Sequence, residues 1–159
     1  MLDVKIEVKN IIKYTDNRGY LASLWKEENG IKFVEDRISY SKYGTIRGFH
    51  GDAVTWKLCV CIKGSIKLVV WDIKKQDKYE FNLNENLRSI LVPPYFLLAH
   101  QCIEDSILLY KWSVPYSGPE DQWSVKYDDP TINANWIKTS SIILSKRDSN
   151  AKTLMELKI

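Results

Sequence analysis

The tetrapeptide Arg47-Gly48-Phe49-His50 combines residue types that acid–base chemistry on an anionic substrate requires. Arg47 offers a planar fork of donors that fits phosphate or carboxylate, and a histidine such as His50 is the usual choice for a general base at neutral pH. Gly48 allows a close approach of its backbone. In an extended strand, Arg47 and Phe49 would face one side and Gly48 and His50 the other. The plainer alternative is a histidine at a strand end that is hydrogen-bonded by a backbone carbonyl.

Three further residues each have a chemical and a structural interpretation. Lys57 could hold negative charge that develops on an oxygen, or it could extend its apolar stem along an edge strand. Tyr110 could be a general acid or a core aromatic, because alternation places it on one face with Leu108 and Trp112. Tyr116, in a proline-flanked turn, could stack on a planar ligand or on a neighbouring proline.

Composition limits the classes of function. The 159 residues, 45% of them hydrophobic, suit one domain over 1–159, with a C-terminal appendage from about residue 138. A net charge of +3 without runs of like charge favours neither nucleic acid nor membrane as a partner. The two histidines lack His-x-His spacing, so we expect no metal and no cofactor. The three cysteines lack CxxC spacing and indicate buried thiols in a cytoplasmic protein.

Most of the chain has the pattern of short strands separated by turns, which predicts an all-β sandwich or barrel. Residues 56–62 and 65–73, joined by Lys63-Gly64, predict the clearest hairpin. Residues 39–44 are polar and predict a turn. Near the C-terminus, 149–158 could form a short helix with Asp148 as its N-cap. The expected strands are 5–14, 20–26, 31–34, 45–50, 56–62, 65–73, 88–92 and 106–114.

The order of these motifs resembles the dTDP-4-dehydrorhamnose 3,5-epimerase family from about Asp16 to Asp148. The motifs that carry the resemblance are Arg18-Gly19, Arg47-Gly48-Phe49-His50, Lys57-Leu58, Val69-Val70-Trp71-Asp72-Ile73, Pro93 with Ala99-His100, Tyr110-Lys111, Tyr116 and Leu144-Ser145-Lys146-Arg147-Asp148. The resemblance implies a double-stranded β-helix, the cupin jelly roll, in a homodimer. It also implies an isomerase that acts on nucleotide-linked 4-keto-6-deoxy sugars in surface polysaccharide biosynthesis.

The resemblance also implies a role for each matching residue. A ketone at C4 acidifies the hydrogens on C3 and C5, so a base, an acid and a group that holds the enolate oxygen are sufficient for inversion. His50 matches the base, Asp148 the carboxylate that orients it, Lys57 the enolate contact and Tyr110 the acid. The substrate-binding positions are matched by Arg18 and Arg47 for sugar and phosphate, His100 for the diphosphate side, Tyr116 for stacking on the base and Arg147 for the nucleotide.

Several positions differ from the family pattern. Glu35-Asp36-Arg37-Ile38-Ser39 stands where the family usually has Gln-x-Asn-x-Ser, and the loop from His50 to Lys57 is shorter than usual. The sequence therefore leaves open the sugar, the nucleotide and whether C3, C5 or both are inverted. Two other functions compete with epimerisation. One is a nucleotide-sugar 3,4-ketoisomerase, which is disfavoured because His50 is followed by Gly51-Asp52. The other is a jelly roll that binds a nucleotide sugar without catalysis.

Overall fold

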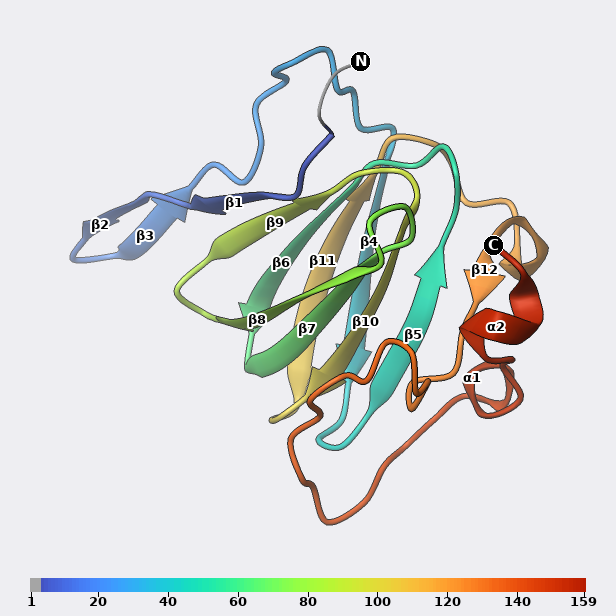
Figure 1. Ribbon diagram of the computed structural model, residues 1–159. Coiled ribbons are helices and arrows are strands. Elements are labelled where there is room, and N and C mark those ends of the chain that lie inside the picture. The colour runs from blue at the N-terminus through green and yellow to red at the C-terminus, as the bar shows by residue number, and fades with distance from the viewer. Residues whose placement is uncertain (1–3) are drawn as a thin grey trace.

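The computed structural model describes residues 4–159, so the first three residues of the expected domain lie outside it. Within these residues, two antiparallel five-stranded sheets face each other as a jelly roll, as predicted (Figure 1). The first sheet has the strand order β1 (Glu7–Asn10), β9 (Arg88–Val92), β6 (Lys57–Lys63), β11 (Ser106–Trp112) and β4 (Glu35–Ser41). The second has the order β12 (Trp123–Ser124), β5 (Ile46–Gly51), β10 (Phe96–Cys102), β7 (Ser65–Asp72) and β8 (Asp77–Asn84).

The remaining elements lie outside the two sheets. Strands β2 (Lys13–Asp16) and β3 (Gly19–Ala22) form a separate hairpin that projects from the sandwich (Figure 1). The 3₁₀ helix η1 (Pro119–Asp121) precedes β12, and the chain ends with α1 (Lys146–Ser149) and α2 (Leu154–Leu157). None of the helices in residues 4–159 has the length and apolar character of a membrane span.

Apolar side chains pack in three layers. The central layer lies between the sheets and contains all three cysteines as free thiols, as their spacing predicted. A second layer covers the outer face of the second sheet, where Trp136 and Leu154 pack over Phe49 and Leu97. A third layer covers the first sheet on its outer side. Because both faces of the central strands are buried, the inward positions of these strands are held rigidly.

The predicted hairpin of residues 56–62 and 65–73 is wrong in its pairing, although both strands exist. Strand β6 pairs with β9 and β11, whereas β7 pairs with β8 and β10. The turn at Gly64, with φ of +81°, therefore takes the chain from one sheet to the other. A Cβ there would lie 2.5 Å from the Asp105 carbonyl oxygen, so the tight crossover requires glycine.

Other expectations also fail. Residues 31–34, expected as a strand, form only an isolated bridge at Ile31. Residues 39–41 belong to strand β4, whose apolar Ile38 and Tyr40 point outward and whose polar Ser39 and Ser41 point inward, so the usual alternation is inverted. The expected helix over 149–158 is two separate turns, α1 and α2. Each has its own N-cap, Ser145 and Thr153, so Asp148 is not a cap.

Candidate active site

A cavity of about 450 Å³ lies between the two sheets, a volume suited to a small-molecule ligand. Its walls bring together residues that are far apart in the sequence. Strand β5 supplies His50, β6 supplies Lys57, β11 supplies Tyr110, and α1 supplies Asp148. The full lining is Arg37, Ile38, Ser39, Arg47, His50, Lys57, Leu98, Tyr110, Trp112, Tyr116, Pro119, Gln122, Ser145, Arg147 and Asp148.

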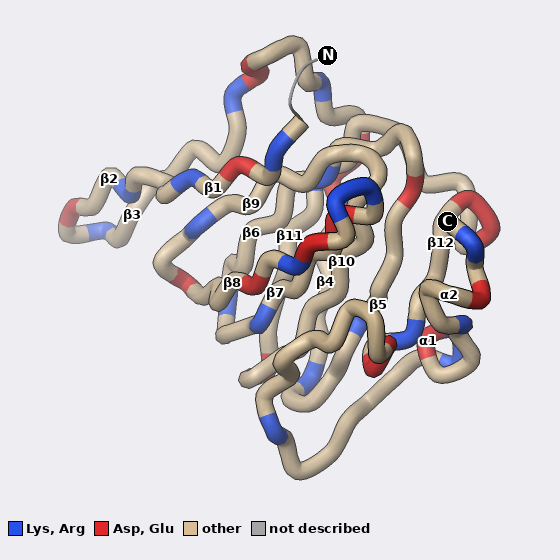
Figure 2. Tube along the Cα trace, viewed as in Figure 1, with Lys and Arg blue, Asp and Glu red and all other residues tan. Residues whose placement is uncertain are grey.

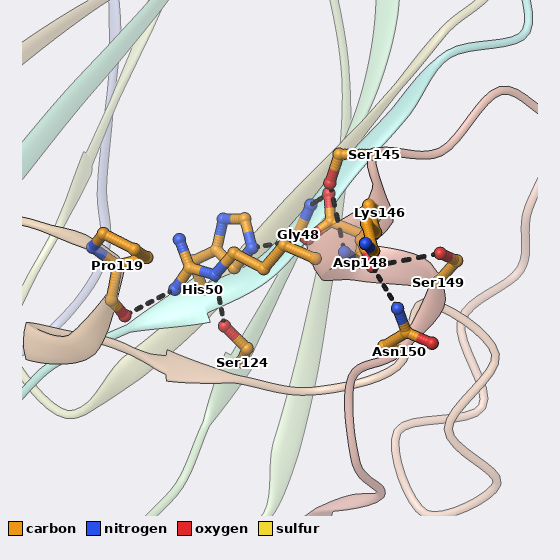
Figure 3. A network of polar contacts seen from close by, with 10 residues as sticks. Gly48, His50, Pro119, Ser124, Ser145, Lys146, Asp148, Ser149 and Asn150 are labelled. Atoms are coloured by element: carbon orange, nitrogen blue, oxygen red, sulfur yellow. Dashed lines mark hydrogen bonds and ion pairs between the residues drawn. The ribbon is translucent and has the colours of Figure 1, made fainter.

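His50 and Asp148 form a close pair at the wall of this cavity. The His50 Nε2 atom lies 2.6 Å from Asp148 Oδ1, and Figure 3 shows the two side chains in contact. A carboxylate can only accept, so His50 donates its Nε2–H and keeps a lone pair on Nδ1. Because the His50 side chain is 24% exposed, this nitrogen can act as a base toward a bound molecule.

The position of Asp148 is fixed by the start of α1. Ser145 accepts a hydrogen bond from the Asp148 backbone N–H, and Asp148 Oδ2 accepts one from the Gly48 N–H. Burial raises the pKa of the Asp148 carboxyl, but the bond to His50 and these neighbours hold it below its usual value. Asp148 therefore remains ionised and orients the imidazole.

The expected alternation of Arg47 and His50 is wrong, because both residues line the cavity while Phe49 packs on the outer face of the sheet. The pairing of β5 with β10 shifts in register between Leu98 and His100, opposite this segment. Gly48 has φ of +111°, and a Cβ there would lie 2.4 Å from the Leu98 carbonyl oxygen. The irregularity turns both Arg47 and His50 toward one cavity.

Lys57 is buried rather than extended into solvent, being only 3% exposed. Its ammonium lies 3.2 Å from Asp52 Oδ2 and 5.0 Å from the centre of the Trp112 ring. Burial lowers the pKa of Lys57, and the charge of Asp52 opposes that shift. Burial also raises the pKa of Asp52, but Lys57 and two backbone donors outweigh this and lower it. The pair places a cation beside the cavity.

Asp52 is a site residue that the sequence reasoning did not assign. Its Oδ1 accepts hydrogen bonds from the backbone N–H groups of Val54 and Thr55, at 3.0 and 2.6 Å. The signal in the sequence is an aspartate two residues beyond the candidate base, at the start of a short loop before Lys57. The aspartate thus both shapes the loop and holds the lysine.

Tyr110 lines the cavity from the sheet opposite to that of His50. Burial raises the pKa of its hydroxyl well above the usual value, so the group stays protonated. The hydroxyl lies 2.9 Å from Nδ1 of His100, which is 1% exposed and outside the cavity lining. The structure therefore does not bring His100 to the surface that would meet a diphosphate.

Two arginines face the cavity with their charges available. Arg47 Nε donates to Ser41 Oγ at 2.8 Å, and Arg147 Nε donates to Ser124 Oγ at 2.8 Å. Arg147 also donates to the Pro119 carbonyl oxygen. Both of its partners, Ser124 and Pro119, are labelled in Figure 3. Neutral oxygens orient both guanidinium groups without cancelling their charge, an arrangement that suits a polyanionic ligand.

Tyr116 lies at the cavity wall, where its backbone N–H donates to Glu35 at 2.7 Å. The guanidinium of Arg37 lies 4.3 Å from the centre of the Tyr116 ring, and the Trp112 ring packs edge-on at 5.5 Å. Arg37 also lines the cavity, and it was not assigned from sequence. The available signal is its place in the segment that departs from the family pattern.

Arg18 lies away from the cavity in this chain. It is at the tip of the β2–β3 hairpin, and its side chain is 85% exposed and paired with Asp16 at 2.5 Å. Figure 2 shows an acidic and a basic residue at the end of this projecting hairpin. Among residues 4–159, no three His, Cys, Asp or Glu side chains are grouped as metal ligands.

Comparison with known proteins identifies the family. The dTDP-4-dehydrorhamnose 3,5-epimerase family model matches residues 5–156. Relatives of that name from Methanothermobacter thermautotrophicus and Sinorhizobium fredii are 33% and 30% identical, covering 90% and 92% of this chain and 86% and 84% of theirs. A solved dTDP-4-dehydrorhamnose 3,5-epimerase structure from Bacillus anthracis is 26% identical with a TM-score of 0.86, covering 94% of each chain. The chain therefore belongs to the dTDP-4-dehydrorhamnose 3,5-epimerase family of carbohydrate isomerases.

Proposed function

We propose that this chain inverts C3, C5 or both in a nucleoside-diphosphate-linked 4-keto-6-deoxy sugar. One observation carries the proposal: a histidine base held by a buried carboxylate and a protonated tyrosine line one cavity from facing sheets. Inversion needs such an arrangement, because the proton must leave one face of the carbon and return to the other.

The roles follow from what each group can do. The C4 ketone lets His50 Nδ1 take a proton from the adjacent carbon, and the electron pair moves onto the ketone oxygen. The ammonium of Lys57 stabilises that enolate oxygen. Tyr110 then gives its proton to the carbon from the opposite side. We assign Arg47 and Arg147 to the diphosphate.

Tyr116 and Arg37 are proposed to contact the nucleotide base. The Bacillus anthracis structure is described with TDP and PPi bound, and we propose a thymidine nucleotide here as well. Arg37 covers part of the Tyr116 ring, so a base would stack beside the guanidinium. We also propose that the pathway is surface polysaccharide biosynthesis and that the protein is cytoplasmic, which its three free thiols support.

A homodimer is proposed from the β2–β3 hairpin. The hairpin exposes apolar side chains, among them Tyr14 and Leu21, which is 75% exposed. An exposed apolar surface on an isolated hairpin is typical of a protein interface. In a dimer the hairpin could carry Arg18 to the partner's cavity, which would give this residue the binding role that it does not have within one chain.

The experiment is proton exchange with a dTDP-linked 4-keto-6-deoxyhexose in D₂O, followed by NMR. The wild-type protein should incorporate deuterium at C3 or C5 and produce inverted sugar. His50→Ala should remove both signals, and Tyr110→Phe should remove inversion. Tyr79→Phe is a matched control, because it also deletes one phenolic hydroxyl from a strand tyrosine packed on the central core.

The outcomes separate the competing functions. Binding without deuterium incorporation, for 4-keto sugars on several nucleotides, would support the non-catalytic alternative and refute the proposal. Movement of the keto group from C4 to C3 would identify the ketoisomerase. Heptoses and hexoses on different nucleotides, tested in parallel, would determine the sugar and the base.

A further inference from the structure

The buried side chain of His100 has no assigned part in the proposed chemistry. It lies on β10 and points inward between the apolar Leu98 and Cys102, and it is 1% exposed. Its Nδ1 lies 2.9 Å from the hydroxyl of Tyr110, the proposed acid, while its Nε2 is buried with no hydrogen-bond partner among the described residues. Burying a histidine in this apolar layer costs free energy, and its single hydrogen bond to Tyr110 offsets only part of that cost.

The unpartnered Nε2 indicates which tautomer is present. If Nε2 carried the proton, a buried N–H donor would be left without an acceptor, which is rare and unfavourable in folded proteins. If Nδ1 carries it, only a lone pair is left unpaired. Burial lowers the pKa of His100 to about 3, with Arg47 and His50 contributing, so the ring stays neutral and carries a single proton.

We infer that His100 is the positioning residue of the acid: its Nδ1–H donates to the Tyr110 oxygen and leaves the tyrosine O–H directed into the cavity. In the opposite arrangement, Tyr110 would donate to Nδ1 and its proton would point away from the substrate. The inference rests on the proposed function, because it explains how Tyr110 can deliver a proton.

The same hydrogen bond also stabilises the product of proton transfer. When Tyr110 protonates the carbon, its O–H bond breaks, a C–H bond forms and a phenolate remains, while His50 holds the proton that it removed from the other face. Charge therefore balances within the site. An N–H already aimed at the Tyr110 oxygen gains strength as negative charge develops there, so it favours the step without rearranging.

The chain offers a donor-restoring variant and a matched control. His100→Phe removes the donor, whereas His100→Asn places an amide N–H near the former Nδ1. Gln101→Leu is the control, because Gln101 is also fully buried on β10 but faces the other way, bonding the backbone of Ile137. All three variants disturb the same strand, and only His100→Phe removes a donor to Tyr110.

The readout is the ratio of deuterium exchange to inversion in D₂O. His50 still removes and returns protons on its own face in every variant, so exchange without inversion continues. His100→Phe should slow inversion by about 100-fold and raise the exchange-to-inversion ratio at least about tenfold. His100→Asn should recover most of the inversion, and Gln101→Leu should keep the wild-type ratio. A wild-type ratio in His100→Phe, or no recovery in His100→Asn, would overturn the inference.

A second measurement needs no variant. Nitrogen-15 NMR of labelled wild-type protein distinguishes the protonated from the bare ring nitrogen of each histidine, and His100 should have its proton on Nδ1. A proton on Nε2 refutes the inference even if the variants do not fold. This spectrum also separates the two proposals, because it reports the hydrogen bond whether or not any sugar is converted.

Discussion

Replacing Lys57 with methionine should destabilise the protein through the aspartate that it leaves behind. Lys57 and Asp52 are 3% and 8% exposed, and their charged atoms lie 3.2 Å apart. Methionine fills a similar volume, so little packing is lost. The ionised Asp52 carboxylate would then be buried without its counter-ion, and the loss of stability arises from that group.

The magnitude can be bounded from the geometry. At 3.2 Å and an effective dielectric constant of about 20, the attraction between the two charges is about 5 kcal/mol. Breaking a buried ion pair typically reduces stability by about 3–5 kcal/mol. Asp52 keeps two backbone donors, from Val54 and Thr55, so we expect the lower end, about 3 kcal/mol.

The assay is a double-mutant cycle. Urea unfolding, monitored by tryptophan fluorescence, would compare Lys57→Met, Asp52→Asn and the double variant. The carboxamide that Asp52→Asn introduces can still accept the two backbone hydrogen bonds. The double variant should be more stable than Lys57→Met, with a coupling energy of about 1.5 kcal/mol or more. If the two single losses simply add, to within about 0.5 kcal/mol, the pair is not coupled and the reasoning is refuted.

Three further predictions concern the residues that support the site. Because the pKa of His100 is about 3 in the folded protein and 6.5 ordinarily, the unfolded chain binds the extra proton between these values. Stability should therefore fall as pH drops from 6.5 toward 3, by up to about 1.4 kcal/mol per pH unit, and urea unfolding should show a shallower fall in His100→Phe. Ser145→Ala removes the cap of α1 and should reduce stability by about 1 kcal/mol and kcat more than tenfold, measured by melting and by inversion rate; unchanged kcat would show that Asp148 does not depend on the cap. Gly48→Ala places a Cβ 2.4 Å from the Leu98 carbonyl oxygen and should lower stability by about 2 kcal/mol or more in thermal unfolding, which a wild-type Tm would contradict.

Most strands with one apolar face were predictable, but β8 was missed although Tyr79, Phe81 and Leu83 pack on the central layer. The pairing of the strands was not predictable. In β6 the cysteines Cys59 and Cys61 lie on one face, as alternation along a strand requires, and that face meets the other sheet. Local pattern carries no information about which strand lies alongside, so β6 and β7 were paired although Gly64 separates them into different sheets.

Strands near the cavity were the hardest to find from sequence. In β4 the polar Arg37 and Ser39 line the cavity, and the apolar Ile38 and Tyr40 are exposed. In β10 every residue is buried, so its sequence lacks alternation altogether. Both failures have one cause. The prediction uses the difference in polarity between the two faces of a strand, and a strand that borders a binding site, or that is buried on both faces, lacks that difference.

The site could be predicted as a set of residues but not as an arrangement. The family resemblance implied that His50, Lys57, Tyr110 and Asp148 act together, and all four line one cavity. The roles of partners such as Asp52 depend on distances across loops and sheets. His100 shows the difference well, since its motif suggested a ligand contact and its burial shows a contact with Tyr110 instead.

The net charge of +3 conceals how the cavity is built to meet an anion. On the hairpin, Arg18 is cancelled by Asp16, so its charge contributes little to the field around it. In the cavity, serine hydroxyls and a backbone carbonyl orient Arg47 and Arg147, and their charges remain whole. Orientation by neutral acceptors fixes a guanidinium without reducing its attraction for phosphate. Exchanging Ser41 or Ser124 for aspartate would keep that geometry while removing the attraction, so substrate affinity should fall with little change in fold.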